Sequence, residues 1–207
     1  MDSVFKQNAL KSHAETLLKR HEETPYTVFL CGPTIQELEK AVPDPEKLKK
    51  YGPPAYLRKQ LKDELESTGF DVVLGEDDGL EDARLQIGLN AQDNELEFIV
   101  QQCDAVVLVA GSVGSFCELG LFSWHFTHSK GAIKNTEADK DFILIVDKQF
   151  EGDRSYFNEG PAEVVSSFGQ TIYADFNDFD INKLIRRLRT RKSLVGKDGR
   201  GKPRKQP

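Results

Sequence analysis

Five short apolar runs, separated by longer stretches of mixed polarity, constrain the fold of this chain most strongly. Each run has the length of a strand, and most are rich in β-branched or aromatic residues. The stretches between them carry helical patterns, such as leucines at positions 57, 61 and 65, and we expect further helices over residues 94–103 and 182–191. We expect loops over residues 42–54, which hold four prolines, and over the acidic residues 75–93. This alternation predicts an α/β fold: a Rossmann-like or flavodoxin-like parallel sheet of about five strands with helices on both faces. The runs are residues 26–31, 70–74, 105–110, 142–146 and 170–173.

The chain divides into three parts by pattern and charge. Residues 1–25 predict an amphipathic helix, residues 26–185 the α/β domain, and residues 186–207 a basic tail that we expect to be disordered. The tail holds ten Lys or Arg and one acid, a charge of +9, whereas the rest holds 18 basic and 33 acidic residues, a charge of −15. A basic end of this kind favours self-association or contact with nucleic acid, and the alternative is a merely solvated terminus.

The sequence carries no sign of a membrane segment, a metal site or a cofactor site. No apolar run is long enough to span a bilayer and the N-terminus lacks the apolar core of a signal peptide, so we expect a cytoplasmic protein. Cys31, Cys103 and Cys117 have no close spacing and predict reduced thiols. His125 and His128 lie three residues apart, but no carboxylate or thiol stands at a metal-binding distance from them in the sequence.

Small and polar residues follow the predicted strands, at the points where each strand ends. Right-handed crossovers place the C-terminal ends of parallel strands at one edge of the sheet, which is where ligands bind in open α/β folds. The candidate site residues at this edge are Gly32, Pro33 and Thr34; Glu76, Asp77 and Asp78; Gly111, Ser112, Ser115 and Glu118; and Asp147 and Lys148.

Glu118 is the most informative of these residues. It follows a loop of small residues and stands at the start of an apolar segment, residues 119–126, that predicts a helix. Small residues let a ligand approach the backbone, and the N-terminus of a helix offers free amides to an anion. The same amide dipoles favour an ionised carboxylate. The segment therefore predicts a sugar or nucleotide site with an acid in its floor.

Three motifs lie at or near the strand ends: residues 29–32, residues 104–108 and residues 114–120. They resemble those of the nucleoside 2-deoxyribosyltransferase superfamily, which includes nucleotide N-glycosidases. Two further motifs are residues 154–161 and the acidic turn Glu76-Asp77. With these, the chain resembles the deoxyribosyltransferase-like effectors of bacterial retron anti-phage systems. The resemblance runs from about residue 28 to residue 165. Those effectors carry a winged-helix-like C-terminal region, where this chain has the basic tail.

The resemblance implies that Glu118 attacks or stabilises the anomeric carbon while an N-glycosidic bond breaks. This bond breaks through an oxocarbenium-like state, which a carboxylate stabilises. The departing base needs a proton or a hydrogen bond, and the candidates for supplying it are Asp77, Asp78 or a water held by them. Asp104 or Asp147 could accept from the sugar hydroxyls, although Asp104 is also well placed to hold a turn before its strand.

The remaining candidates each have a functional and a structural interpretation. Ser112 and Ser115, with the amides of their loop, could bind a 5′-phosphate or could make ordinary turn contacts. Gly32 allows either close approach of a ligand or the exit turn of the first strand, beside Pro33. Arg154 and Asn158 could complete the pocket or a subunit interface, or they could cap the following helix.

The function that the resemblance implies is an N-glycosidase or (deoxy)ribosyltransferase acting on a nucleoside, a nucleotide or NAD. Its setting would be anti-phage defence, as a toxic effector held silent by a reverse transcriptase with its RNA–DNA, which the basic tail would contact. We also expect a homo-oligomer. The alternatives are a nucleotide-sensing module without turnover and an NAD hydrolase similar to TIR domains.

Overall fold

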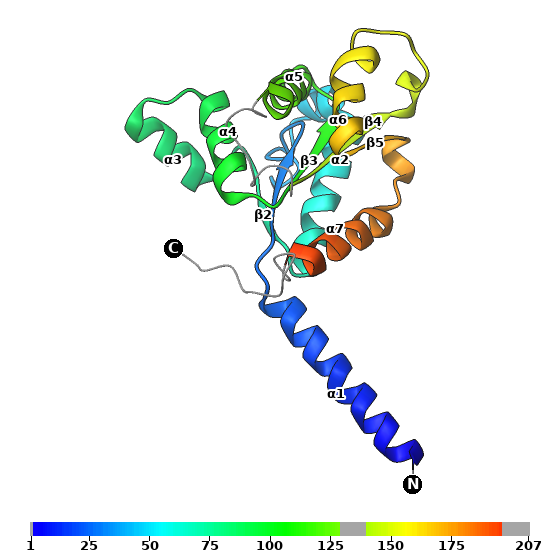
Figure 1. The fold of residues 1–207 in the computed structure, drawn as a ribbon. Helices are drawn as coiled ribbons and strands as arrows, with labels where there is room; N and C mark the ends of the chain where they lie inside the picture. Colours follow the sequence, from blue (N-terminus) through cyan, green and yellow to red (C-terminus); the bar gives the residue numbers. More distant parts are fainter. Residues whose placement is uncertain (1, 129–139, 196–207) are drawn as a thin grey trace. The chain divides into compact units, whose positions relative to one another are not determined.

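The sheet and the helices that cover it form the larger of two compact units. The computed structural model describes residues 2–128 and 140–195. One unit is Thr27–Ile181, and the other combines Met1–Tyr26 with Asn182–Pro207. The larger unit contains a five-stranded parallel sheet with helices, which confirms the predicted α/β fold class (Figure 1).

The strand order is β2-β1-β3-β4-β5, and every neighbouring pair is parallel. All five strands lie where the apolar runs predicted them. β3 and β4 are buried along nearly their whole length, as central parallel strands are when helices cover both faces. The order reverses between β1 and β3, and a reversal of this kind opens a crevice at the C-terminal edge of the sheet. The strands are β1 (Thr27–Cys31), β2 (Asp71–Val73), β3 (Ala105–Ala110), β4 (Asp141–Asp147) and β5 (Gln170–Ala174).

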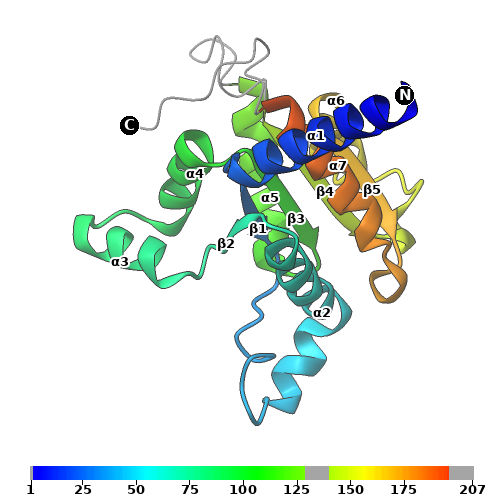
Figure 2. The same ribbon diagram turned by 90° about the horizontal axis from the view of Figure 1, so that it is seen from below.

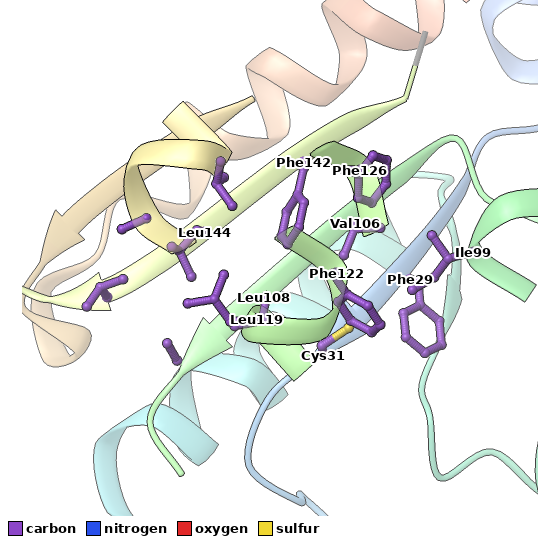
Figure 3. Packing of buried hydrophobic residues seen from close by; sticks show 14 of the residues in the cluster. Phe29, Cys31, Ile99, Val106, Leu108, Leu119, Phe122, Phe126, Phe142 and Leu144 are labelled. Carbon is purple, nitrogen blue, oxygen red and sulfur yellow. The ribbon is translucent and has the colours of Figure 1, made fainter. Parts of the chain in front are cut away.

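One face of the sheet is covered by α4 (Ala91–Gln102), α5 (Val113–His128) and α6 (Glu163–Phe168). Aromatic side chains interlock there (Figure 3): the ring of Phe142 on β4 lies 6.4 Å from that of Phe122 and 5.6 Å from that of Phe126. These packed rings fix α5, the helix that carries Glu118, against the strands.

The opposite face is covered by α2 (Pro45–Ser67), which packs on β1, β2 and β3 (Figure 2). Its inward side holds Leu57, Leu61 and Leu65, as the leucine spacing predicted. We expected a loop over residues 42–54, but a short helix precedes a kink at Gly52, whose φ of 41° is left-handed. Asp44 starts this short helix because its carboxylate accepts from the Glu46 amide at 3.0 Å.

The connection from β2 to β3 is a pair of helices rather than the polar loop and single helix that we expected. α3 (Asp78–Ile87) and α4 lie beside the β2 edge (Figure 1). Asn90 caps the start of α4 by accepting from the Asp93 amide at 2.9 Å. α4 therefore begins a turn before the expected helix at 94–103, and α5 begins six residues before the expected one at residue 119.

Short helical turns at Lys148–Phe150 and Asn158–Ala162 lie between β4 and β5, and another, at Phe176–Asp178, follows β5. In the smaller unit, α1 (Asp2–Glu23) exposes Leu10, Leu17 and Leu18. α7 (Ile181–Val195) confirms the basic helix that we expected over residues 182–191. It also corrects the expected start of the disordered tail, because residues 186–195 are helical. The rest of that tail lies outside the described residues.

Candidate active site

Glu118 lines a cavity of about 280 Å³ at the point where the strand order reverses. Its Oε2 atom is fully buried and has no hydrogen-bond partner in the part of the chain that the structure describes. A buried carboxylate oxygen that no protein group satisfies costs stability, which marks Glu118 as a candidate functional residue of this cavity. The cavity is lined by Phe29, Cys31, Gly32, Thr34, Arg58, Gly75, Glu76, Glu81, Arg84, Ala91, Asn94, Glu95 and Glu118.

The position of Glu118 within α5 corrects our expectation about its charge. Because α5 begins at Val113, Glu118 is the sixth residue of the helix and lies past the free amides of its first turn. Burial raises the pKa of Glu118 to about 7, and the Glu95 carboxylate adds to the rise, while Arg58 opposes it. The helix N-terminus therefore does not hold Glu118 ionised; burial instead brings its titration close to neutral pH.

Glu95, on α4, is a second carboxyl group in the same cavity, and the sequence patterns did not single it out. Burial raises its pKa to about 7 as well, with a further rise from Glu76 and a fall from Arg58. Glu95 lies four residues before the buried Ile99 and thus on the inward stripe of α4. A carboxylate on an apolar stripe was the signal in the sequence that could have identified it.

Two glycines shape this cavity. A Cβ on Gly75 would collide with Oε1 of Glu95, so only a residue without a side chain lets the Glu95 carboxyl occupy its position. Gly32 has a φ of 144°, and a Cβ there would lie 3.0 Å from the Val109 carbonyl oxygen. The predicted role of Gly32 in the exit turn of the first strand agrees with this close packing, and the residue also lines the cavity.

Arg58 holds the cavity wall together. The guanidinium is buried and donates to both carboxylate oxygens of Glu76, at 2.6 and 2.7 Å. It also donates to the carbonyl oxygen of Leu30, at 2.8 Å, and to that of Pro33, at 3.0 Å. This network ties the end of β1 to the turn after β2, and it occupies the carbonyl of Pro33, which sequence analysis placed in the substrate site.

Asp77 and Asp78, the predicted proton donors, do not line the Glu118 cavity. Oδ2 of Asp77 accepts from the Leu74 amide at 2.8 Å and thereby closes the turn after β2. Asp77 lies instead beside another hollow, with Val73 and Phe98, and Asp78 is exposed at the start of α3. Glu76, Glu81 and Glu95 line the cavity with Glu118, but Glu76 pairs with Arg58 and Glu81 with Arg84. Glu95 is therefore the carboxyl group of the lining that forms no ion pair with another described residue.

The amides of the loop at residues 111–115, which we considered as a 5′-phosphate site, are bonded by the hydroxyls of the same loop. Oγ of Ser115 accepts from the amides of Gly111 and Ser112, both at 2.9 Å. Oγ of Ser112 accepts from the Ser115 amide at 3.2 Å, and Ser115 is buried. Because these amides already have partners, the structural interpretation of Ser112 and Ser115, which sequence analysis left open, accounts for both residues.

Asp104 lies at the wrong edge of the sheet for a substrate contact. It precedes β3, and its Oδ2 accepts from the Thr27 amide at 2.9 Å at the start of β1. The C-terminal ends of both strands, where Glu118 lies, are at the opposite edge. Asp104 thus holds the N-terminal ends of two parallel strands, the alternative that its position before a strand had already indicated.

The other predicted residues lie away from Glu118. Gly111 and Asp147 line a separate cavity, described below. Asn158 donates to the carbonyl oxygens of Phe150 and Asp153 and accepts from the Tyr173 hydroxyl. Arg154 is exposed and pairs with Glu159 at 2.9 Å. Neither Arg154 nor Asn158 borders the Glu118 cavity, so their contacts are those of a folded loop.

Within residues 2–128 and 140–195, no group of three His, Cys, Asp or Glu side chains is arranged to hold a metal ion. Over the same residues, no helix combines the length and the apolar character that crossing a bilayer would require.

Comparison with known proteins places the chain in a family. A search of curated proteins found no match. A family model, described as STM3845 retron effector protein, matches residues 54–205. This match includes α3 and α4, β3, and the helix that carries Glu118. It covers well over half of the sequence, and the chain therefore belongs to the STM3845 retron effector protein family.

Proposed function

We propose that this protein breaks the N-glycosidic bond of a nucleoside, a nucleotide or NAD, and that it acts as a toxic effector in anti-phage defence. The observation that carries the proposal is that Glu118 lines a cavity at the switch point of the sheet, while its buried Oε2 accepts no hydrogen bond from the described residues. Membership of a retron effector family suggests the defensive role. The motif resemblance to nucleoside 2-deoxyribosyltransferases supports the chemistry.

Glu118 would act on the sugar. As the bond from C1′ to the base nitrogen breaks, its electron pair leaves with the base and positive charge develops on the sugar ring. The ionised Glu118 would stabilise that charge or add to C1′ as a nucleophile. Water or a second base would then take the place of Glu118 at C1′, which gives hydrolysis or transfer.

Glu95 would act on the base. With both pKa values near 7, the pair can hold one proton at neutral pH, shared as a coupled unit. In the productive form Glu118 is ionised and Glu95 is protonated, so Glu95 can donate to the departing base. This division of roles between two neighbouring carboxyl groups follows the pattern of glycoside-cleaving enzymes.

The charges that line the cavity bear on which base leaves most easily. Glu76 pairs with Arg58, and Glu81 pairs with Arg84 at 2.8 Å, so the two pairs cancel. Glu95 and Glu118 form no ion pair with any described Lys or Arg. This arrangement favours a base that is cationic in the substrate, such as the pyridinium of NAD, or one that gains a proton as it leaves.

The direct test is incubation of the purified protein with nucleosides, nucleotides and NAD, followed by chromatography of the released base. Glu118→Gln should abolish release and keep the fold. Glu95→Gln should slow release of an adenine or cytosine base by about 10²–10⁴-fold, the usual contribution of general acid catalysis. It should slow release of nicotinamide far less, because a pyridinium base leaves as a neutral molecule without a proton.

Glu97→Gln provides the matched control, because Glu97 is an exposed carboxylate on the same helix. Unchanged turnover by Glu118→Gln would contradict the proposal. Binding of a nucleotide without release of base would favour the nucleotide-sensing alternative. A homo-oligomer, and contact of the basic C-terminal part with a reverse transcriptase and its RNA–DNA, remain part of the proposal; α7 exposes Lys183, Arg186 and Arg189.

A further inference from the structure

A second cavity, of about 330 Å³, lies over the C-terminal ends of β3, β4 and β5. Its volume is at the lower end of the range of small-molecule sites, about 300–1,000 Å³, and suits a ligand the size of a mononucleotide. Four aromatic side chains line it: Tyr51, Phe116, Phe150 and Phe176. Rings of this kind provide flat apolar surfaces for a planar ligand.

This cavity shares no lining residue with the cavity of Glu118. Gly111 and Pro54 meet at its border so closely that a Cβ on Gly111 would collide with the proline ring, and Pro33 lies next to the same point. The contact of Gly111 with Pro54 therefore forms part of its wall. A ligand held there makes its contacts with residues that the proposed glycosidase chemistry does not use.

Asp147 supplies an acceptor in the second cavity. Its Oδ1 accepts from the Gln149 amide at 2.9 Å, whereas its Oδ2 has no hydrogen-bond partner among the described residues. Asp175 also lines the cavity, but both of its oxygens are engaged, one by the Asn177 amide and the other by Lys148. Asp147 is therefore the carboxylate with an oxygen available to an amino group of a ligand.

Lys49 and Lys50 bring positive charge to the same cavity. Both are exposed, lie on the short helix before the Gly52 kink, and form no ion pair with any residue in the described ranges. The ammonium of Lys50 lies 5.2 Å from the ring centre of Tyr51. Paired lysines bind phosphate as point charges. The nearby amides of Gly111 and Ser112 are already bonded to Ser115, which leaves the lysines as the groups that would meet an anion.

We propose that the second cavity binds a nucleoside 5′-monophosphate whose base carries an amino group. The base lies among the aromatic side chains, its amino group donates to Asp147, and its phosphate meets Lys49 and Lys50. The proposal is independent of the glycosidase activity, because it concerns binding at residues that do not line the Glu118 cavity.

The test is calorimetric titration of the full chain carrying Glu118→Gln, which prevents turnover, with 5′-AMP, adenosine and 5′-UMP as probes. We expect 5′-AMP to bind more tightly than 5′-UMP, which lacks an amino group. Asp147→Asn replaces the free acceptor oxygen with an amide donor but keeps an oxygen that can accept from the Gln149 amide. It should lower the affinity for 5′-AMP by about 10–100-fold.

The double variant Lys49→Ala/Lys50→Ala should lower the affinity for 5′-AMP and leave the affinity for adenosine unchanged, because only the phosphate meets the lysines. Lys59→Ala is the matched control, because Lys59 lies on α2 outside the cavity and pairs with Asp63. The proposal fails if 5′-AMP does not bind at millimolar concentration. It also fails if the Asp147→Asn and Lys49→Ala/Lys50→Ala variants bind 5′-AMP as tightly as the chain that carries Glu118→Gln alone. These binding measurements do not depend on base release by the unsubstituted protein. A failure of the nucleotide-binding proposal would therefore leave the proposed glycosidase function untouched.

Discussion

Gly75 leaves the space that the carboxyl group of Glu95 occupies: a side chain of even one carbon on Gly75 would overlap Oε1 of Glu95. Gly75→Ala should therefore displace the Glu95 carboxyl while keeping its charge. The backbone at Gly75 is not left-handed, and the colliding atom is the end of a flexible side chain, so stability should change by no more than about 1 kcal/mol. The rate of adenine release should fall by about 10²-fold, because a displacement of about 1 Å can cost a catalytic group that much.

Gly79→Ala is the control for this substitution, because a Cβ on Gly79 meets nothing within 4 Å. Equal loss of activity in both variants, or none in Gly75→Ala, would contradict the role given to Glu95. The measurements are turnover by chromatography and thermal unfolding of each variant.

Glu118 should make the fold less stable as the pH rises. Its folded pKa of about 7 lies above the ordinary 4.5, so the unfolded chain loses the proton first. Below pH 4.5 Glu118 does not lower the free energy of unfolding. Between pH 4.5 and 7 the loss of unfolding free energy grows, and above pH 7 it levels off at about 3 kcal/mol. Glu118→Gln should therefore be more stable than the unchanged protein at pH 8 and nearly equal at pH 4.5. Thermal unfolding at both pH values checks this, and a difference that does not vary with pH would contradict it.

The rate of base release should follow a bell-shaped pH profile with its maximum near pH 7, for a base that needs a proton. Below the maximum Glu118 becomes protonated and loses its negative charge; above it Glu95 loses the proton that it donates. In Glu95→Gln the alkaline fall should disappear along with most of the rate. With NAD as substrate the alkaline fall should be weak from the start. A profile that is flat from pH 5 to 9 would count against both assignments.

Arg58 and Glu76 should behave as a coupled pair. Arg58→Met leaves the Glu76 carboxylate without its partner, and the loss of a partner from a buried ion pair costs about 3–5 kcal/mol. The double variant Arg58→Met/Glu76→Gln should recover a substantial part of that loss, because no unpaired charge remains. Chemical denaturation of the two single variants and the double variant measures this coupling. Strictly additive losses would mean that the pair does not act as a unit.

The apolar runs were sufficient to predict the sheet, because a buried parallel strand needs an unbroken apolar stretch wherever it occurs. They also predicted the edge at which Glu118 lies. The start of α5 was misplaced because Ser112 and Ser115 cap each other within a loop of small residues, and small polar residues favour both loops and helix caps. The short helix before Gly52 was missed for a similar reason, since proline fits the first turn of a helix as well as a loop.

The partners of Glu118 could not be predicted from local patterns. Asp77 and Asp78 follow a strand end, as site residues should, but Asp77 is used to close its own turn. Glu95 and Arg58 lie inside helices, on stripes that otherwise bury apolar side chains. Their proximity depends on how α2 and α4 pack on the sheet. The sequence offered one indication, a charged residue within an apolar stripe. That pattern indicates that the charge is buried but does not show which residue it pairs with.

The absence of any shared lining residue between the two cavities has a consequence for substitutions in either one. Substitutions in the short helix before Gly52, or in the turns after β4 and β5, would change the proposed nucleotide cavity, which the Gly111–Pro54 contact borders. The proposed reactive pair, Glu95 and Glu118, lines the other cavity together with residues of α3, of α4 and of the turn after β2. On these two proposals, a substitution that changes recognition at one cavity leaves every lining residue of the other in place.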